Sequence, residues 1–190
     1  MLSLRREPNR PARLLFAAVL LLPSATFQPR AVAAESFKSF KLKDLSGTER
    51  SLADFPGRVT LIVFFHPTCQ YCKVALPGLQ TIDNTYKERG LSVIWINVLP
   101  EENGMMAEFK AEHGLTAPLL AATHSVQRDY RLTMTPTHYL IDAKRTVLWT
   151  HAGYKPGDEA LIEKKIQEAL AAPSAAHADM IPAWMRNRTF

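Results

Sequence analysis

The only two cysteines of the 190-residue chain lie three residues apart, in the segment Cys69-Gln70-Tyr71-Cys72. This segment comes shortly after an apolar run at 59–65, which is typical of a buried strand, and before a stretch that can be helical. The pair is therefore predicted to lie at a helix N-terminus, where unpaired backbone N–H groups and the helix dipole favour an anion and lower the pKa of a Cys69 thiol. The sulfur of Cys72, one helical turn further on, is expected within bonding distance of the Cys69 sulfur. A dithiol placed in this way can attack a disulfide and then resolve the mixed disulfide internally.

Residues 1–34 have the pattern of a secretory signal peptide that is removed after Ala33 or Ala34. A segment with four arginines precedes a nine-residue apolar run at 14–22, and small residues surround the expected cleavage position. This run is shorter than the roughly 20 residues that span a bilayer. An exported protein with a cleaved leader is therefore favoured over an uncleaved membrane anchor, and the long leucine core argues against an organellar leader.

The charge of the chain lies mostly in this leader. It carries five Arg and one Glu, so that 18 of the 23 basic and 17 of the 18 acidic residues lie beyond it. This near balance gives no support for nucleic-acid binding. The remaining length is sufficient for one domain with a sizeable core. A disulfide that closes a loop of two residues constrains the unfolded chain very little, so we favour a reactive role for the cysteines over a structural one.

Beyond the leader, the pattern predicts strands alternating with helices. The expected elements are a β-hairpin near 37–50, a strand at 59–65, a helix at 69–89 kinked by Pro77, a strand at 91–98, a polar loop at 100–104, a helix at 105–113, a short strand at 117–121, a helical turn at 125–130, strands at 137–141 and 147–151, and a helix at 158–171. This order predicts one α/β domain at 35–172 with a mixed central sheet flanked by helices. The tail at 173–190 is rich in Ala, Ser and Pro and is predicted to be loosely held.

Two segments carry a resemblance to a known family. They are F-F-H-P-T-C-Q-Y-C-K-V-A-L-P-G-L at 64–79 and M-T-P-T-H-Y-L-I-D at 134–142. They resemble thioredoxin-fold proteins, in particular the exported thioredoxin-like thiol-disulfide oxidoreductases, a group that includes cytochrome c maturation reductants. The opening segment F-K-L-K-D-L-S-G at 40–47 is similar to an N-terminal β-hairpin extension of that group. The resemblance covers about 37–171 and implies a thioredoxin fold with this extension.

The resemblance also implies roles for individual residues. Cys69, at the more accessible helix tip, would be the attacking nucleophile and Cys72 the resolving thiol of a redox-active disulfide. Gln70 and Tyr71 are the intervening dipeptide, which helps to set the reduction potential in this family and adjoins the substrate.

The second segment supplies the expected substrate-binding residues. Pro136 would be the cis-proline that faces the disulfide. Thr135 would present its backbone to an extended substrate strand, a form of β-augmentation.

Further chemistry-bearing side chains allow more than one assignment. His66 either lowers the Cys69 pKa as an imidazolium or is an ordinary loop histidine, and Thr68 stands where relatives usually carry Trp. His138 faces either the site or the opposite side of its strand.

Glu101 and Glu102 follow the second central strand, where exported reductants of this type often place an acidic residue. One of them either relays the proton of the buried cysteine or is merely solvated.

The predicted function is that of an exported thiol-disulfide oxidoreductase that reduces periplasmic protein clients such as apocytochrome c. The resemblance implies a membrane electron donor, and we expect a monomer that needs no bound cofactor or metal. Alternatives are a disulfide oxidase or isomerase of the same fold, a peroxiredoxin-like peroxidase, and a soft-metal protein that binds Cu(I). Peroxiredoxins carry Pro-x-x-x-Thr-x-x-Cys, whereas Pro67-Thr68-Cys69 is contiguous here. Copper-delivery proteins of this fold typically carry Cys-x-x-x-Cys, one residue longer than the spacing here.

Overall fold

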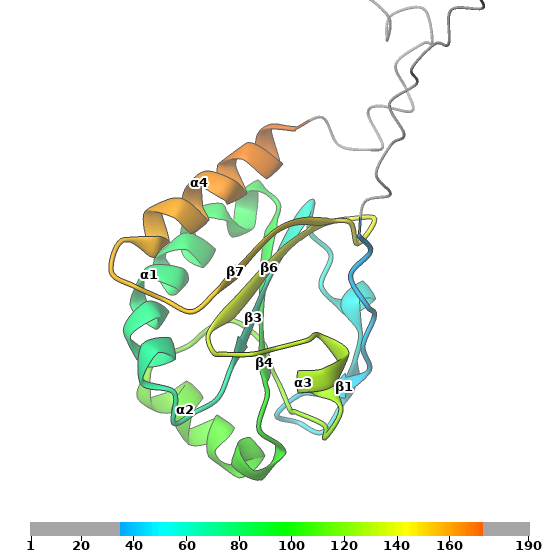
Figure 1. Ribbon diagram of the computed structural model, residues 1–190, viewed down its shortest axis with the longest axis vertical. Coiled ribbons are helices and arrows are strands. Elements are labelled where there is room, and N and C mark those ends of the chain that lie inside the picture. Colours follow the sequence, from blue (N-terminus) through cyan, green and yellow to red (C-terminus); the bar gives the residue numbers. More distant parts are fainter. Residues whose placement is uncertain (1–34, 173–190) are drawn as a thin grey trace, which may run out of the picture. The chain divides into compact units, whose positions relative to one another are not determined.

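A five-stranded mixed sheet forms the centre of the computed structural model, which describes residues 35–172 (Figure 1). The predicted signal peptide at 1–34 and the tail at 173–190 lie outside the described residues. In chain order the elements are β1 (Leu42–Lys43), β2 (Glu49–Arg50), the 3-10 helix η1 (Leu52–Asp54), β3 (Val59–Phe65), α1 (Gln70–Tyr86), η2 (Lys87–Arg89), β4 (Leu91–Asn97), η3 (Pro100–Met105), α2 (Met106–Glu112), β5 (Leu119–Leu120), α3 (Val126–Asp129), β6 (Thr137–Asp142), β7 (Val147–Ala152) and α4 (Asp158–Ala171).

The sheet has the strand order β5-β4-β3-β6-β7. Strand β3 pairs in parallel with β4, whose other neighbour β5 is also parallel, whereas β6 and β7 are antiparallel to their neighbours. All seven residues of β3 are buried, as expected for a central strand that is covered on both faces. The predicted mixed sheet flanked by helices is therefore confirmed.

The element boundaries differ from the expectation at one informative place. The polar stretch after β4, expected to be a loop, forms the 3-10 helix η3, with Pro100 in its first turn. Proline is favoured there because its fixed φ suits a helix and its missing N–H leaves no donor unpaired. Within residues 35–172, none of the helices is both long and apolar enough to cross a membrane.

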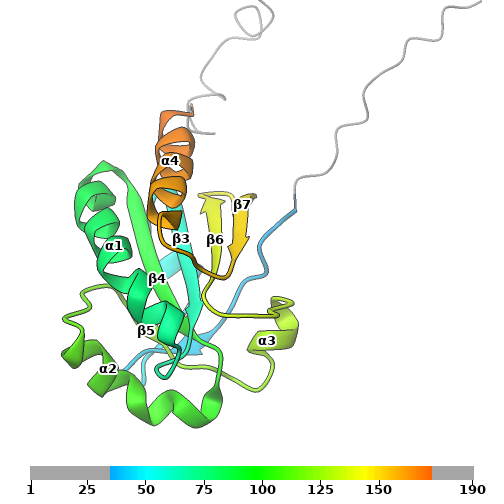
Figure 2. The same ribbon diagram turned by 60° about the vertical axis from the view of Figure 1, so that its left-hand side comes forward.

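The two faces of the sheet carry separate apolar cores. Helices α1 and α4 lie on one side of the sheet (Figure 2). Together with α2 they cover the odd-numbered residues of β3, and the cysteines belong to this core. On the other face, α3 and the N-terminal segment cover the even-numbered residues of β3. The site is therefore built on the face that α1 and α4 cover.

The N-terminal segment crosses the sheet on the second face. Ser36 bridges to Thr146, beside β7, and Asp44 bridges to Leu120 in β5, at the opposite edge. Between these bridges the Phe37 ring stacks on the Tyr130 ring of the second core, with the two centroids 5.0 Å apart. The predicted N-terminal hairpin is present as the antiparallel pair β1–β2. It completes a layer that buries the back of the sheet.

Candidate active site

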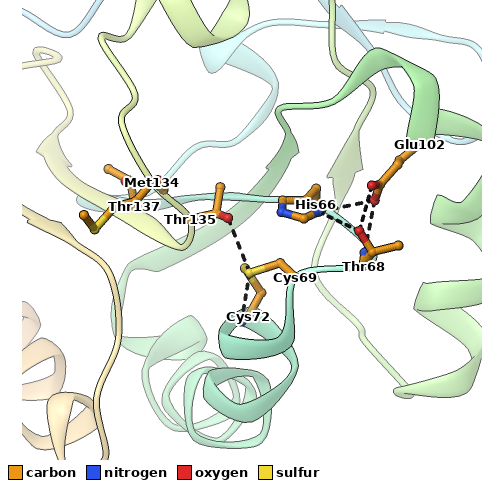
Figure 3. The surroundings of a disulfide bond; sticks show 8 residues. All are labelled: His66, Thr68, Cys69, Cys72, Glu102, Met134, Thr135 and Thr137. Atoms are coloured by element: carbon orange, nitrogen blue, oxygen red, sulfur yellow. Dashed lines mark hydrogen bonds and ion pairs between the residues drawn. A yellow bond between two sulfur atoms is a disulfide. The ribbon is translucent and has the colours of Figure 1, made fainter.

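Cys69 and Cys72 form a disulfide at the N-terminus of α1 (Figure 3). Cys69 is the N-cap residue, and its Sγ accepts a hydrogen bond of 3.1 Å from the backbone N–H of Cys72. After reduction, this N–H and the dipole of α1 would stabilise a negative charge on the same sulfur. Cys69 retains 6% exposure and Cys72 has none. The geometry thus supports the predicted order of attack by Cys69 and resolution by Cys72.

The loop before β6 lies against this disulfide. The Thr135–Pro136 peptide bond is cis. Thr135 Oγ1 donates to Cys69 Sγ over 3.4 Å (Figure 3). The carbonyl of Pro136 accepts a hydrogen bond of 2.7 Å from the N–H of Gly153, which holds the loop to the end of β7. The two segments that carry the family resemblance, 64–79 and 134–142, therefore meet at Cys69 Sγ.

Exposed apolar side chains lie on α1 and on the loop before β6, the two segments that meet at Cys69. Tyr71 is 64% exposed and Val74 51% exposed, and their spacing of three residues makes them neighbours on the surface of α1. Met134, next to Thr135, is 52% exposed. We call Tyr71, Val74 and Met134 the apolar rim. Gln70 is also exposed, so both residues between the cysteines face solvent.

Glu102 anchors the loop that leads to Cys69. Its carboxylate accepts hydrogen bonds from Thr68 N–H at 3.0 Å and from Thr68 Oγ1 at 2.7 Å, and Nδ1 of His66 lies 3.3 Å from it (Figure 3). Burial alone would raise the pKa of Glu102, but the hydrogen bonds from Thr68 and the nearby His66 outweigh it and lower the pKa. Glu101 is exposed. Of the two predicted acids, only Glu102 thus belongs to the site, and its partners are in the loop before Cys69.

A buried amide network positions the element that carries Glu102. Asn97, at the end of β4, is fully buried, and its Nδ2 donates to the carbonyl of Leu99 and to Asn103 Oδ1 at 2.7 and 2.9 Å. The same Asn103 oxygen accepts from the N–H of Ala122. These bonds fix both ends of the turn before η3. Sequence reasoning missed both Asn97 and the pairing of Thr68 with Glu102, although a polar residue that closes an apolar strand was a usable signal for Asn97.

We expect Glu102→Gln to lower the free energy of unfolding by about 1 kcal/mol at neutral pH, because it weakens the charge-assisted hydrogen bonds to Thr68. The native pKa of Glu102 is lowered, so its stabilisation is fully present above the ordinary Glu pKa and is lost as pH falls through the native value. Urea titrations at a series of pH values measure the difference. It should shrink towards acidic pH, whereas the exposed control Glu101→Gln should match the wild type throughout.

The remaining predicted residues take definite places. His66 lies beside Glu102, and His138 is buried on the sheet face that α1 and α4 cover. Within residues 35–172, no three His, Cys, Asp or Glu side chains are grouped so as to hold a metal ion.

Comparison with known proteins places this site in a family. The model of the AhpC/TSA family matches residues 33–150. The chain is 29% identical over 116 residues to the thioredoxin-like protein YneN of Bacillus subtilis, covering 60% of this chain and 68% of that one. It is 30% identical over 104 residues to the thiol-disulfide oxidoreductase ResA of Geobacillus kaustophilus, covering 54% of this chain and 59% of that one.

Solved structures give the same result. A crystal structure from Chlorobium tepidum, of a protein provisionally named thiol:disulfide interchange protein DsbE, superimposes with a TM-score of 0.67 at 26% identity. The match covers 73% of this chain and 97% of that one. The thioredoxin fold and the resemblance to thioredoxin-like thiol-disulfide oxidoreductases are thus confirmed. The chain belongs to the AhpC/TSA family, and two of the proteins that it resembles, ResA and the DsbE-named protein, are named for thiol-disulfide exchange.

Proposed function

We propose that this protein is a reductant of disulfides in other proteins, acting outside the cytoplasm through Cys69 and Cys72. The observation that carries the proposal is the placement of Cys69 Sγ at the tip of α1, where it accepts the Cys72 N–H and retains some exposure. Once reduced, a sulfur in that position is stabilised as a thiolate, which is the attacking form in thiol–disulfide exchange.

The proposed reaction transfers two electrons to the client. The Cys69 thiolate attacks one sulfur of the client disulfide, and the other client sulfur leaves as a thiolate that takes up a proton. Cys72 then loses its proton and attacks Cys69 Sγ. The Cys69–client bond breaks and the second client sulfur leaves. The product is the Cys69–Cys72 disulfide, the oxidised state that the structure shows, and a donor dithiol must then reduce it.

The apolar rim supports a protein as the client. Its three large side chains are exposed on the two segments that meet at Cys69, and we assign them as the contact surface for a protein client. Thr135, whose hydroxyl touches Cys69 Sγ, lies beside the rim and offers its backbone to an extended client segment. Gln70 and Tyr71 would contact the client from α1.

Export and the identity of the electron partner rest on the sequence pattern and the resemblance. The leader pattern at 1–34 supports a periplasmic location. A membrane protein would supply the electrons, and apocytochrome c is the client class that we favour. The protein would act as a monomer.

The reduction potential separates a reductant from an oxidant or isomerase. Redox equilibration against glutathione should give a value nearer the roughly −270 mV of thioredoxin than the roughly −120 mV of the oxidant DsbA. A value at the oxidant end would overturn the reductant proposal.

Substrate class needs a second assay. Reduction of insulin disulfides should exceed consumption of peroxide by the same preparation. Fast peroxide turnover without insulin reduction would favour a peroxidase instead.

A further inference from the structure

His138 is a buried histidine whose polar atoms have no evident structural use. It is 0% exposed, and neither ring nitrogen makes a hydrogen bond of normal geometry with any of residues 35–172. Buried polar atoms are nearly always paired, and an unpaired one costs stability. Because both nitrogens of His138 are left unpaired, the protein loses stability at this position. We therefore look for a function that the imidazole serves.

The sheet register places His138 on the same side as Cys72. His138 in β6 is the register partner of Val63 in β3, and Val63 packs in one apolar core with Cys72. Leu140, which shares the His138 face because side chains alternate along a strand, belongs to the same core. The imidazole therefore lies under the helices, on the face where the second sulfur is buried.

The position along the strand also brings His138 close to the disulfide. Helix α1 begins just after the end of β3, and Val63 is two residues from that end. Because β6 runs antiparallel to β3, the start of β6 lies at the same edge, where Thr135 touches Cys69 Sγ. His138 is three residues further on.

The chargeable groups His151 of β7 and Asp158 of α4 lie near His138. Cys72 of α1 belongs to the same core as Val63 and Leu140, which share the His138 face. The His138 and His151 rings are register partners with centroids 6.0 Å apart, and His151 Nε2 lies 2.9 Å from Asp158 Oδ2. The remaining buried side chains of β3 are not ionisable. A chain of titratable groups thus leads from the core to His151, whose side chain is 24% exposed.

We propose that His138 is the base that accepts the Cys72 proton in the resolving step. The inference rests on the proposed function. As the Cys72 S–H bond breaks, its proton passes to the free nitrogen of His138, and the sulfur forms its bond to Cys69 Sγ while the Cys69–client bond breaks. The electron pair of that bond leaves with the client sulfur. The proton then returns to solvent by way of His151. Glu102, which the sequence offered for this task, is instead engaged with Thr68 and His66.

The electrostatics suit this role. Burial, together with repulsion from His151, lowers the pKa of His138 to about 4, although a backbone interaction with His151 and the charge of Asp158 act against the shift. The imidazole is therefore neutral at neutral pH while Cys72 is uncharged, and it is free to accept a proton. A thiolate formed at Cys72 would raise the pKa of its neighbour and hold the proton there during the attack.

Stopped-flow reaction of the reduced full chain with the chromogenic disulfide DTNB separates the two steps. The first release of thiolate reports attack by Cys69, and the second reports resolution by Cys72. In His138→Gln the second phase should slow by roughly 10²-fold, the lower range for general-base catalysis. Its pH profile should move towards that of an unassisted thiol, and the first phase should keep its wild-type rate and pH profile.

The exposed histidine His124 provides the matched control, and His124→Gln should leave both phases unchanged. A second phase with wild-type rate and pH profile in His138→Gln would overturn the inference. If that variant fails to fold, NMR titration of the wild-type imidazole decides instead. Its protonation should respond to reduction of the wild-type disulfide, and the reduced wild type should titrate differently from Cys72→Ser, which lacks the second thiol. An imidazole that titrates identically in the oxidised and reduced wild type contradicts the role. Absence of the first phase in the wild type would count against the proposed function itself.

Discussion

Replacing Cys69 by alanine is expected to reduce insulin-disulfide turnover to the uncatalysed background, whereas replacing Cys72 leaves a covalent adduct with the client. The first change removes the sulfur that accepts the Cys72 N–H at the tip of α1. The second leaves that sulfur in place but removes the Cys72 thiol that would attack the mixed disulfide and release the client. The mixed disulfide therefore persists.

Turnover assays and non-reducing gels with mass spectrometry measure the two outcomes. Asn84→Ala, an exposed position further along α1, is the matched control and should keep full activity. Adduct formation by the Cys69 variant, with none in the Cys72 variant, would reverse the assigned roles.

Phe64→Ala should lower the free energy of unfolding by about 3–5 kcal/mol, the usual cost of a large cavity in a core. Phe64 is 0% exposed and lies in the second core, with its ring centroid 4.8 Å from that of Tyr130 and 5.8 Å from that of Tyr139. The ring of Phe37 is 6.5 Å away, so the cavity would also loosen the N-terminal segment that covers the sheet.

Urea unfolding followed by circular dichroism measures this loss. Leu45→Ala, at a position that is 43% exposed, is the control and should change stability by less than about 0.5 kcal/mol. A loss below about 1 kcal/mol in Phe64→Ala would show that the second core repacks around the smaller side chain.

Much of the fold was predictable because its signals are local. The apolar run that became β3 and the helix that became α1 each show their pattern within one short window. The helix-tip placement of Cys69 follows from those two neighbours alone. The prediction of a loop at 100–104 was wrong, because a single proline and polar residues are compatible with both a loop and the observed η3.

The sequence by itself determined the chemistry that this protein carries: a dithiol at a strand-to-helix junction, followed some 60 residues later by the Thr135–Pro136 pair. Only the tertiary structure decided which polar groups meet. Thr68 and Glu102 lie 34 residues apart in the chain, and His138 reaches the face of Cys72 through the pairing of β6 with β3. Contacts of this kind depend on strand order and register, which arise from the packing of the whole sheet and leave no periodic trace in any one segment.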